Sequence, residues 1–154
     1  MKKRGLMHIP FYYVFIAIVI ALIFIFGYQQ IIRLQNLNEQ AKFIQFKTDF
    51  QSAVNNIYYK NPGSIIAYSL SSANKPLILP GDVKKICLKN LNAQVEVKAN
   101  SKYFKAFTVN NLVAEQGNNL KLESNEYCNG IKNSQFSFIL ENKLINRETL
   151  VYIR

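Results

Sequence analysis

The chain has 154 residues and a formal net charge of +10, with 19 Lys and Arg residues against 9 Asp and Glu. This length allows one small domain once an apolar N-terminal segment is set aside, and it excludes a chain of several domains. A single histidine and two cysteines, without C-x-x-C spacing, exclude the usual zinc and dithiol-redox sites. No P-loop or dinucleotide-binding glycine pattern is present, so the common nucleotide-binding classes are excluded as well.

The first predicted element is a membrane-spanning helix over residues 6–28. Cations at positions 2–4 precede an uncharged run that ends only at Arg33. The most apolar part, residues 9–26, would form a helix of roughly 27 Å, close to the thickness of bilayer hydrocarbon. No small-residue cleavage site follows the run, so the sequence predicts a retained span and not a cleaved secretory signal.

The distribution of charge predicts the orientation of this span. Residues 1–5 form a basic leader, whereas the short stretch from Gly27 to Arg33 carries one cation. Positive charge is retained on the cytoplasmic side, so we expect the N-terminus in the cytoplasm and the C-terminal part outside the cell. The sequence thus predicts a single-pass cell-membrane protein whose first partner is the lipid bilayer.

Residues 29–60 are predicted to continue the helix in amphipathic form. Two stripes of apolar residues recur there at helical spacing, separated by Gln, Asn, Lys and Asp. The helix is expected to end at residues 61–64, Asn-Pro-Gly-Ser, because proline cannot continue a helix and glycine accepts the turn that follows. One stripe can face the domain and the other a neighbouring helix, so both are candidate interfaces. The first stripe contains Leu34, Leu37, Ala41 and Ile44, and the second contains Phe43, Phe46, Phe50, Val54 and Ile57.

The remaining residues, 61–154, are predicted to form a β-rich domain. Runs rich in β-branched and aromatic residues alternate with Ser, Asn, Pro and Gly, without a helical period between them. Glu141-Asn142 is predicted to be one of the turns. The fold prediction is α+β, in which a long N-terminal helix (membrane stem plus amphipathic half) packs on a small antiparallel β-sheet.

Cys87 and Cys128 are predicted to form a disulfide. Both lie in the part expected outside the cytoplasm, where paired cysteines are oxidised. Closing a loop of this length would stabilise the domain by roughly 4 kcal/mol in the chain-entropy model. Two buried free thiols remain the alternative, since Cys87 is flanked by Ile86 and Leu88.

Several lysines are weak candidates for attraction to anionic surfaces, an attraction that salt would screen. Some stand beside Tyr103, Phe104 and Phe107, and such a mixture can hold single-stranded nucleic acid. The pattern also fits an ordinary strand, with aromatics in the core and lysines guarding a sheet edge. We favour the second interpretation, so nucleic acid is not expected to be a partner. The candidates are Lys84, Lys85, Lys102 and Lys105.

The sequence predicts neither enzymatic activity nor a cofactor. The one histidine, His8, precedes the most apolar run, so the exported part lacks the usual general base for a serine or cysteine nucleophile. The glutamates of the exported part are scattered over predicted strands and turns and form no recognisable motif.

The junction between leader and span, Arg4-Gly5-Leu6-Met7, resembles the processing site (class III signal) of archaeal type IV prepilins. In that family a membrane-embedded prepilin-type peptidase cuts after the glycine, which here would leave Leu6 as the mature N-terminus. Many pilins carry a glutamate five residues into the mature chain, where this chain has Pro10. The order of features over most of the first 90 residues is also similar to short single-span archaeal proteins whose function is mostly undefined. These features are the basic N-terminus with its glycine, the stem, the amphipathic helix, a serine-rich strand and the segment from Leu79 to Leu88.

The resemblance implies a pilin-like fold and a structural role. The expected function is that of a non-enzymatic cell-surface subunit, which assembles through its N-terminal helix into a filament or an envelope complex. Its partners would then be copies of itself or related pilin-like subunits. The alternative is a binding or adhesion module that stays anchored in the membrane and does not polymerise. A minor pilin that handles DNA and a membrane-anchored enzyme are further alternatives.

Overall fold

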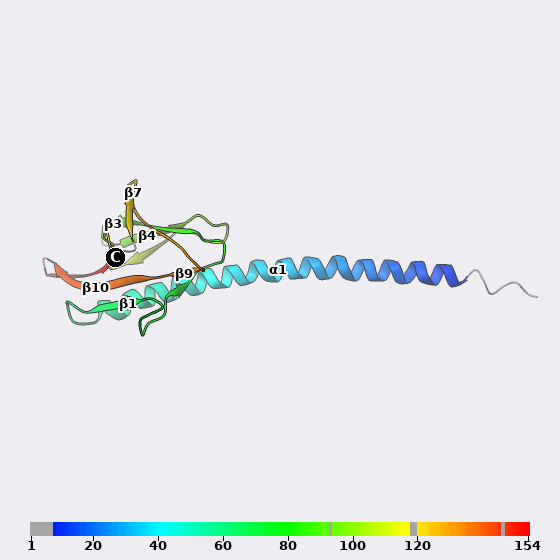
Figure 1. Cartoon of the computed structure of the whole chain (residues 1–154), viewed down its shortest axis with the longest axis horizontal. Helices are drawn as coiled ribbons and strands as arrows, with labels where there is room; N and C mark the ends of the chain where they lie inside the picture. The colour runs from blue at the N-terminus through cyan, green and yellow to red at the C-terminus, as the bar shows by residue number, and fades with distance from the viewer. Residues whose placement is uncertain (1–7, 93, 118–119, 146) are drawn as a thin grey trace, which may run out of the picture. The chain divides into compact units, whose positions relative to one another are not determined.

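Helix α1 forms the N-terminal part of the chain. The computed structural model describes residues 8–92, 94–117, 120–145 and 147–154, and α1 runs without a break from His8 to Tyr58 (Figure 1). Between Phe11 and Tyr58 the sequence holds no proline and a single glycine, Gly27, so nothing interrupts the backbone hydrogen bonds of the helix. The predicted continuous helix is confirmed over these residues.

The helix ends at the turn that the sequence predicts. The amide of Lys60 donates to the carbonyl of Ile57 at 3.0 Å, which tightens the last turn. Gly63 has a φ of +86°, a left-handed conformation that glycine adopts without strain. The hydroxyl of Ser64 then donates to the carbonyl of Asn61 at 2.7 Å and closes the loop toward the first strand.

The chain divides into two compact units, one ending at Asn38 and the other comprising Glu39–Arg154. The second unit contains α1 from Glu39 onward and all the described strands. These strands are β1 (Ile65–Tyr68), β2 (Leu77–Ile78), β3 (Lys85–Leu91), β4 (Gln94–Ala99), β5 (Phe107–Asn110), β6 (Leu112–Ala114), β7 (Lys121–Glu123), β8 (Glu126–Gly130), β9 (Gln135–Phe136), β10 (Phe138–Ile145) and β11 (Glu148–Ile153).

The strands are divided among more sheets than the one small sheet expected. A four-stranded sheet has the order β1-β10-β11-β6, a five-stranded sheet has the order β5-β4-β3-β8-β7, and β2 pairs with β9. Neighbours are antiparallel except β11 and β6, which run parallel. Asn111, with a φ of 58°, bends the chain between β5 and β6, so that these consecutive strands join different sheets.

The core follows the two-residue period of the strands. In β10 the side chains of Phe138, Leu140 and Asn142 are buried, and those between them are half-buried. In β5, Phe107 and Val109 point inward while Thr108 and Asn110 are exposed. The inward side chains of both larger sheets belong to one cluster of buried residues, which also contains the buried face of α1.

The aromatic residues of α1 hold the helix against this core. Figure 1 shows β9 and β10 beside the C-terminal part of α1. The ring centroid of Phe50 lies 5.3 Å from that of Phe138, and the centroid of Phe46 lies 6.2 Å from that of Phe136. Both pairs are edge-to-face, the arrangement that aromatic quadrupoles favour. The helix is therefore part of the domain core and not an appendage to it.

A buried asparagine on β10 fixes the C-terminal end of α1. The Asn142 side chain is fully buried, and its Nδ2 donates to the carbonyls of Ile57 (3.0 Å), Tyr58 (3.2 Å) and Lys60 (2.7 Å). Its own carbonyl accepts the amide of Gly63 at 2.6 Å. The predicted turn at Glu141-Asn142 is therefore wrong: asparagine is common in turns, but here it lies within β10 and its amide donates to carbonyls at and just beyond the end of α1.

Candidate functional site

The N-terminal part of α1 exposes apolar side chains throughout. Phe11 is 78% exposed, Phe24 is 73% exposed, and no charged residue occurs from Phe11 to Ile32. Helix α1 is long and apolar enough to cross a bilayer, and the mean hydropathy of its most apolar stretch is 2.5. Exposed apolar surface of this extent is stable in lipid or against other apolar helices. The length and apolarity predicted for a single membrane span are thus present.

The two apolar stripes of the amphipathic half have different environments. Phe46, Phe50, Val54 and Ile57 are buried in the domain, and Phe43 is half-buried against it. In the other stripe, Leu34 is 64% exposed, Leu37 is 51% exposed and Ile44 is 62% exposed. The helix thus keeps an unpaired apolar stripe in addition to the face that the sheets cover.

The candidate processing residues Arg4, Gly5 and Leu6 lie outside the described residues. The cations at positions 2–4, from which the orientation is predicted, lie outside them too. Cleavage and orientation therefore remain predictions from the sequence.

Cys87 and Cys128 form a disulfide between neighbouring strands. Cys87 on β3 stands directly opposite Cys128 on β8, and the two sulfur atoms are 2.07 Å apart. The bond joins residues 41 positions apart in the chain. It therefore cross-links the middle of the five-stranded sheet, as the sequence predicts, and neither cysteine is a free thiol.

The same pair stands close to a carboxylate. Glu126 and the two cysteines offer possible ligand atoms within 4.8 Å of one another. Both sulfur atoms are already bonded to each other, and Glu126 lies 3.5 Å from the Lys98 ammonium. This cluster presents no set of open ligands for a metal in the oxidised protein.

The four candidate lysines are found in two separate places. Lys84 and Lys85 line a hollow of about 420 Å³ beside the disulfide, where Lys85 forms an ion pair with Glu123. Lys102 and Lys105 line a smaller hollow of about 260 Å³ beside α1. The structure does not bring the four lysines together into one basic patch.

The aromatic residues near Lys102 and Lys105 belong mainly to the core. Phe104 is 6% exposed and Phe107 is 8% exposed, and both rings pack on Phe43 and Phe46 of α1. These phenylalanines offer no open faces on which bases could stack. The preferred interpretation of this stretch, core aromatics with lysines outside, is confirmed for them.

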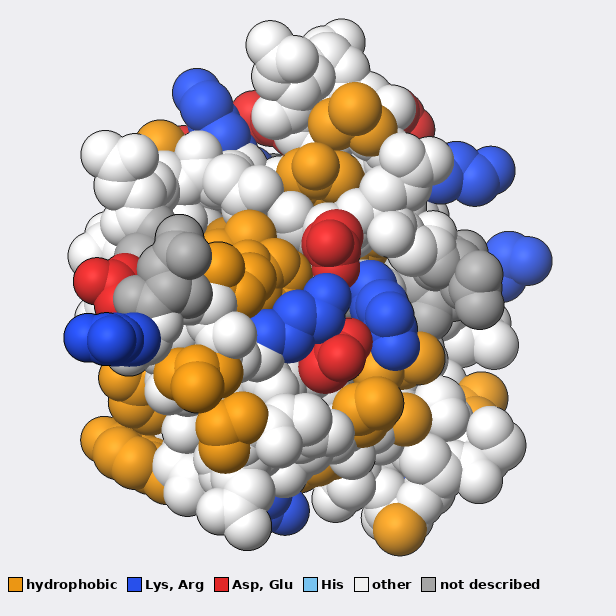
Figure 2. Space-filling model, turned by 90° about the vertical axis from the view of Figure 1, so that its left-hand side faces the viewer, with side chains coloured by type: hydrophobic (Ala, Val, Ile, Leu, Met, Phe, Trp, Pro, Cys, Tyr) orange, Lys and Arg blue, Asp and Glu red, His pale blue; other side chains and the backbone are white. Residues whose placement is uncertain are grey.

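Charges of both signs alternate on one face of the domain. Figure 2 shows basic and acidic side chains in contact near the middle of this view, with separate apolar side chains around them. Among the ion pairs of the domain, the Lys143 ammonium lies 3.0 Å from the Glu115 carboxylate, and Arg154 lies 3.4 Å from Glu141. This face therefore offers no broad single-sign surface, although the chain as a whole is basic.

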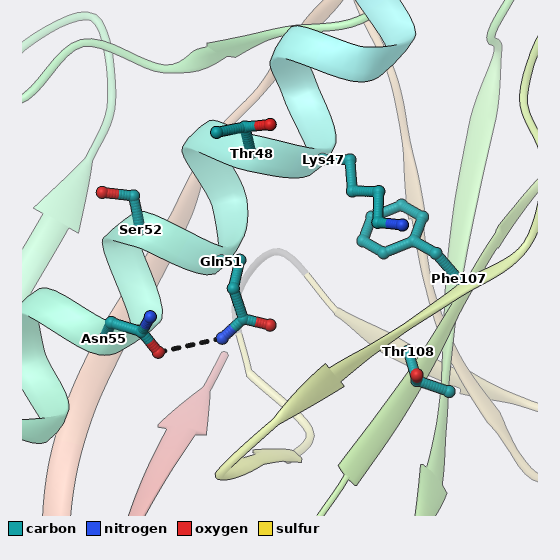
Figure 3. Close-up of a pocket in the computed structure, with 7 residues that line it drawn as sticks. All are labelled: Lys47, Thr48, Gln51, Ser52, Asn55, Phe107 and Thr108. Atoms are coloured by element: carbon teal, nitrogen blue, oxygen red, sulfur yellow. Dashed lines mark hydrogen bonds between the residues drawn. The ribbon is translucent and has the colours of Figure 1, made fainter.

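A further hollow, which the sequence does not indicate, lies between α1 and β5 and has a volume of about 420 Å³. Figure 3 shows Lys47, Gln51 and Asn55 on the helix and Phe107 and Thr108 on the strand. The Gln51 amide donates to Asn55 Oδ1 at 2.9 Å, and the Lys47 ammonium lies 5.7 Å from the centroid of the Phe107 ring. The seven lining residues are Lys47, Thr48, Gln51, Ser52, Asn55, Phe107 and Thr108.

This hollow and the smaller one beside it form what we call the helix–strand trough. The smaller hollow is lined by Gln40, Phe43, Ile44, Lys102, Tyr103 and Lys105. Ile44 and Thr48 are one helical turn apart on α1, and Lys105 and Phe107 are two residues apart in the chain, so neighbouring segments line the two hollows. A combination of cations, amides and hydroxyls can recognise a ligand by charge and hydrogen bonds.

Three ionisable groups of the domain have shifted pKa values. The hydrogen bond from Lys42, together with one from the amide of Gly81, lowers the pKa of the Glu39 carboxyl. Hydrogen bonding to Glu96, reinforced by Glu126, raises the pKa of Lys98. Burial raises the pKa of the Tyr68 hydroxyl. The causes are ion pairing and ordinary burial, so none of these shifts points to a catalytic group.

Comparison with models of protein families, with curated proteins and with solved structures finds no match. The features available for a functional proposal are therefore those of the chain itself: the exposed apolar half of α1, its uncovered stripe, and the helix–strand trough.

Proposed function

We propose that this chain is a non-enzymatic, type IV pilin-like subunit of the cell surface. Its N-terminus would lie in the cytoplasm and its β-rich domain outside, and α1 would mediate assembly into a filament or an envelope complex. The observation that supports this most is the double use of α1. One helix exposes apolar side chains over its N-terminal part and buries Phe46, Phe50 and Val54 in the domain core over its C-terminal part.

This double use suits a subunit that exists in two surroundings. Before assembly the exposed apolar side chains are solvated by lipid, and after assembly they pack against the same side chains of neighbouring helices. The uncovered stripe with Leu34, Leu37 and Ile44 extends an apolar surface for such packing beyond the membrane segment. A soluble binding protein would have no use for either surface.

Processing is tested by mass spectrometry of the N-terminus of the native protein. We expect a mature chain that begins at Leu6. Replacing Gly5 by valine should leave the leader attached, because the peptidase of the family that the junction resembles cuts after a glycine. Gly27→Val is the matched control: a Cβ at Gly27 meets no atom within 4 Å, so the leader should still be removed. An intact leader on the native protein would exclude the pilin-like function.

Assembly is tested by shearing cells and measuring the protein released. Leu37→Lys places a charge on the uncovered stripe and should reduce the released fraction, while the protein is still made and processed. Gln35→Lys adds the same charge two residues earlier, at an exposed position on the opposite side of the helix from Leu37, and should have little effect. Equal release from the two variants would show that the stripe is not an assembly surface.

A permanently anchored module is the second candidate, favoured by Pro10 at the position of the docking glutamate. It predicts a processed or unprocessed chain that stays in the membrane fraction after shearing. Recovery of the native protein in the sheared fraction would exclude this alternative.

A further inference from the structure

β5 has one side without a strand partner. It is an edge strand of the five-stranded sheet and pairs only with β4. In an antiparallel pair, alternate residues direct their N–H and C=O groups toward the partner and away from it. The amide of Asn110 donates to Gln51 Oε1 on α1 at 3.4 Å, so Asn110 directs its backbone away from β4 and toward the helix.

Thr108, two residues earlier, directs its backbone to the same side. Its N–H and C=O groups therefore face the helix–strand trough, which Thr108 also lines. No hydrogen bond to these two groups occurs among the described residues. Since backbone groups of this kind form hydrogen bonds readily, this edge is open to a further extended chain at Thr108, whereas Gln51 already accepts the amide of Asn110.

The opposite wall of the trough is formed by α1. Figure 3 shows the Lys47 and Gln51 side chains directed toward β5 and the Ser52 hydroxyl directed away from it. The Thr48 hydroxyl already donates to the carbonyl of Ile44 at 3.0 Å. The helix therefore contributes the Lys47 ammonium and the Gln51 amide to the side of the trough that faces Thr108.

The charges around the trough are all of one sign. Lys47 lies at its middle, and Lys102 and Lys105 lie at the end formed by the smaller hollow. None of these lysines forms an ion pair within the described part of the chain, and none of the described lining residues is acidic. The nearby carboxylate of Asp82 already accepts hydrogen bonds from Ser101 and from the amide of Lys102.

From these observations we propose that the helix–strand trough binds an acidic peptide segment in extended conformation. The segment adds to β5 as a further strand, through hydrogen bonds to the backbone of Thr108. Its carboxylates lie beside Lys47, Lys102 and Lys105. Backbone pairing gives such complexes their affinity, and the charges select among extended chains. The buried rings of Phe104 and Phe107 argue against a nucleic acid, which would need open aromatic faces.

The first test uses the full-length protein in neutral detergent micelles and a short fluorescent peptide in which aspartate alternates with valine. Fluorescence anisotropy should show saturable binding that weakens as salt is added. Hydrogen exchange, measured by NMR, should show that the amide of Thr108 exchanges more slowly when the peptide is bound. Binding without any change in exchange at Thr108 would overturn the proposal.

Two substitutions separate the contribution of the backbone from that of the side chain. Thr108→Pro removes the outward N–H without touching the ladder to β4, and proline is tolerated on an edge strand. It should weaken peptide binding by about three- to tenfold, the effect of one hydrogen bond. Thr108→Val keeps the N–H and should bind as the natural protein does. Equal binding by the natural protein and both variants would overturn strand addition.

The double variant Lys47→Glu, Lys105→Glu tests the charge without depending on how Thr108→Pro folds. Both side chains are exposed, so the domain should unfold at the same temperature as before. Peptide binding should weaken by about tenfold or more and lose its salt dependence. A single-stranded oligonucleotide is the comparison ligand. If it binds as tightly as the peptide, and if Thr108→Pro weakens the binding of neither, the trough is a general polyanion surface and the proposal is wrong.

Discussion

At the scale of single residues, Asn142 shows how a polar side chain can be the best occupant of a core. The last carbonyls of α1 have no helical partners, and the domain buries them. Asn142 Nδ2 donates to the carbonyls of Ile57 and Tyr58 in the last turn and of Lys60 just beyond it, although its own Oδ1 has no hydrogen-bond partner among the described residues. The unsatisfied oxygen costs less than several unsatisfied carbonyls would.

Replacing Asn142 by alanine should therefore destabilise the domain by about 1–3 kcal/mol, the cost of leaving buried acceptors without donors. Asn142→Asp should be at least as harmful, because it keeps the shape of the side chain but places a carboxylate against the carbonyls. Urea unfolding of both variants measures the effect. An aspartate variant as stable as the natural protein would mean that the amide donor is unimportant.

The carboxyl of Glu39 provides a prediction about pH. Its Oε2 accepts the amide of Gly81 at 2.9 Å and its Oε1 accepts Lys42 at 2.7 Å, and these contacts lower its pKa. A carboxyl with a lowered pKa stabilises the fold above its unfolded pKa, and this stabilisation is lost as the pH falls through the folded value. The natural protein should be more stable than Glu39→Gln at neutral pH, by less than about 1 kcal/mol for so exposed a pair.

Unfolding measured over a range of pH tests this difference. It should be constant above the ordinary glutamate pKa of about 4.3 and disappear at pH values below the lowered pKa of the folded state. A difference of the same size at all pH values would show that charge at Glu39 plays no part.

The sequence could predict little at this scale. The pairing of Cys87 with Cys128 follows from there being two cysteines in one compartment. The role of Asn142 does not follow from the sequence in the same way. The carbonyls that accept hydrogen bonds from its amide belong to residues more than 80 positions earlier in the chain. Local preference favours a turn for asparagine, and tertiary packing overrides that preference.

At the scale of elements, helix α1 is the best predicted part of the protein. Its apolar residues recur with the helical period, and its end carries the proline and glycine that stop a helix. Which stripe would be covered did not follow from the period. The phenylalanine-rich stripe supplies larger side chains to the core, and the domain covers that stripe while Ile44 of the other remains exposed.

Truncating each stripe at one position should reveal this difference. Phe50→Ala leaves a cavity at a fully buried position and should reduce the free energy of unfolding by about 3–5 kcal/mol. Ile44→Ala, on the exposed stripe of the same helix, should change it by no more than about 0.5 kcal/mol. Chemical unfolding of the two variants decides, and similar losses at both positions would contradict the assignment of the buried face.

The strands were predictable as strands but not as sheets. Alternating apolar residues identify β4 and β5 from the sequence alone, whereas the predicted turn at Glu141-Asn142 wrongly divides β10. The division into several sheets depends on bends such as Asn111, and the parallel pairing of β11 with β6 joins segments far apart in the chain. No local pattern reports such long-range pairing.

The disulfide belongs to this scale because it joins β3 to β8. Replacing both Cys87 and Cys128 by alanine should destabilise the domain by roughly 4 kcal/mol, the loop-closure value for a cross-link between residues 41 positions apart. The natural protein should also migrate faster on a non-reducing gel than on a reducing one, and the double variant should not. Unchanged thermal stability of the variant would contradict a structural role for the bond.

At the scale of the whole molecule, the two units differ in how they bury their apolar side chains. The unit that begins at Glu39 contains the described hydrophobic core, whereas the apolar residues before it are exposed. A fragment comprising residues 33–154 should therefore be soluble without detergent and form the disulfide of the full chain. Gel filtration and circular dichroism measure this, and an aggregated or unfolded fragment would show that the apolar segment is needed for folding.

A candidate functional surface could be predicted when its residues lie close together in the sequence. The membrane segment and the apolar stripes lie within single stretches of sequence, so their spacing reveals them. The helix–strand trough combines Lys47 of α1 with Thr108 of β5, and nothing in either stretch indicates the other. The sequence therefore does not indicate Lys47 as a binding residue. Lys84 and Lys85 are candidates for attraction to anionic surfaces because they are adjacent in the chain.

The place of β11 in the four-stranded sheet bears on the timing of folding. β11 lies between β10 and β6, yet it is the strand furthest along the described chain. A domain threaded through a membrane from its N-terminal end cannot complete this sheet until Ile153 has emerged. Until then β6 has no partner and β10 pairs only with β1. If the domain is exported as we propose, this chain order leaves the four-stranded sheet incomplete during passage, and β11 completes it afterwards.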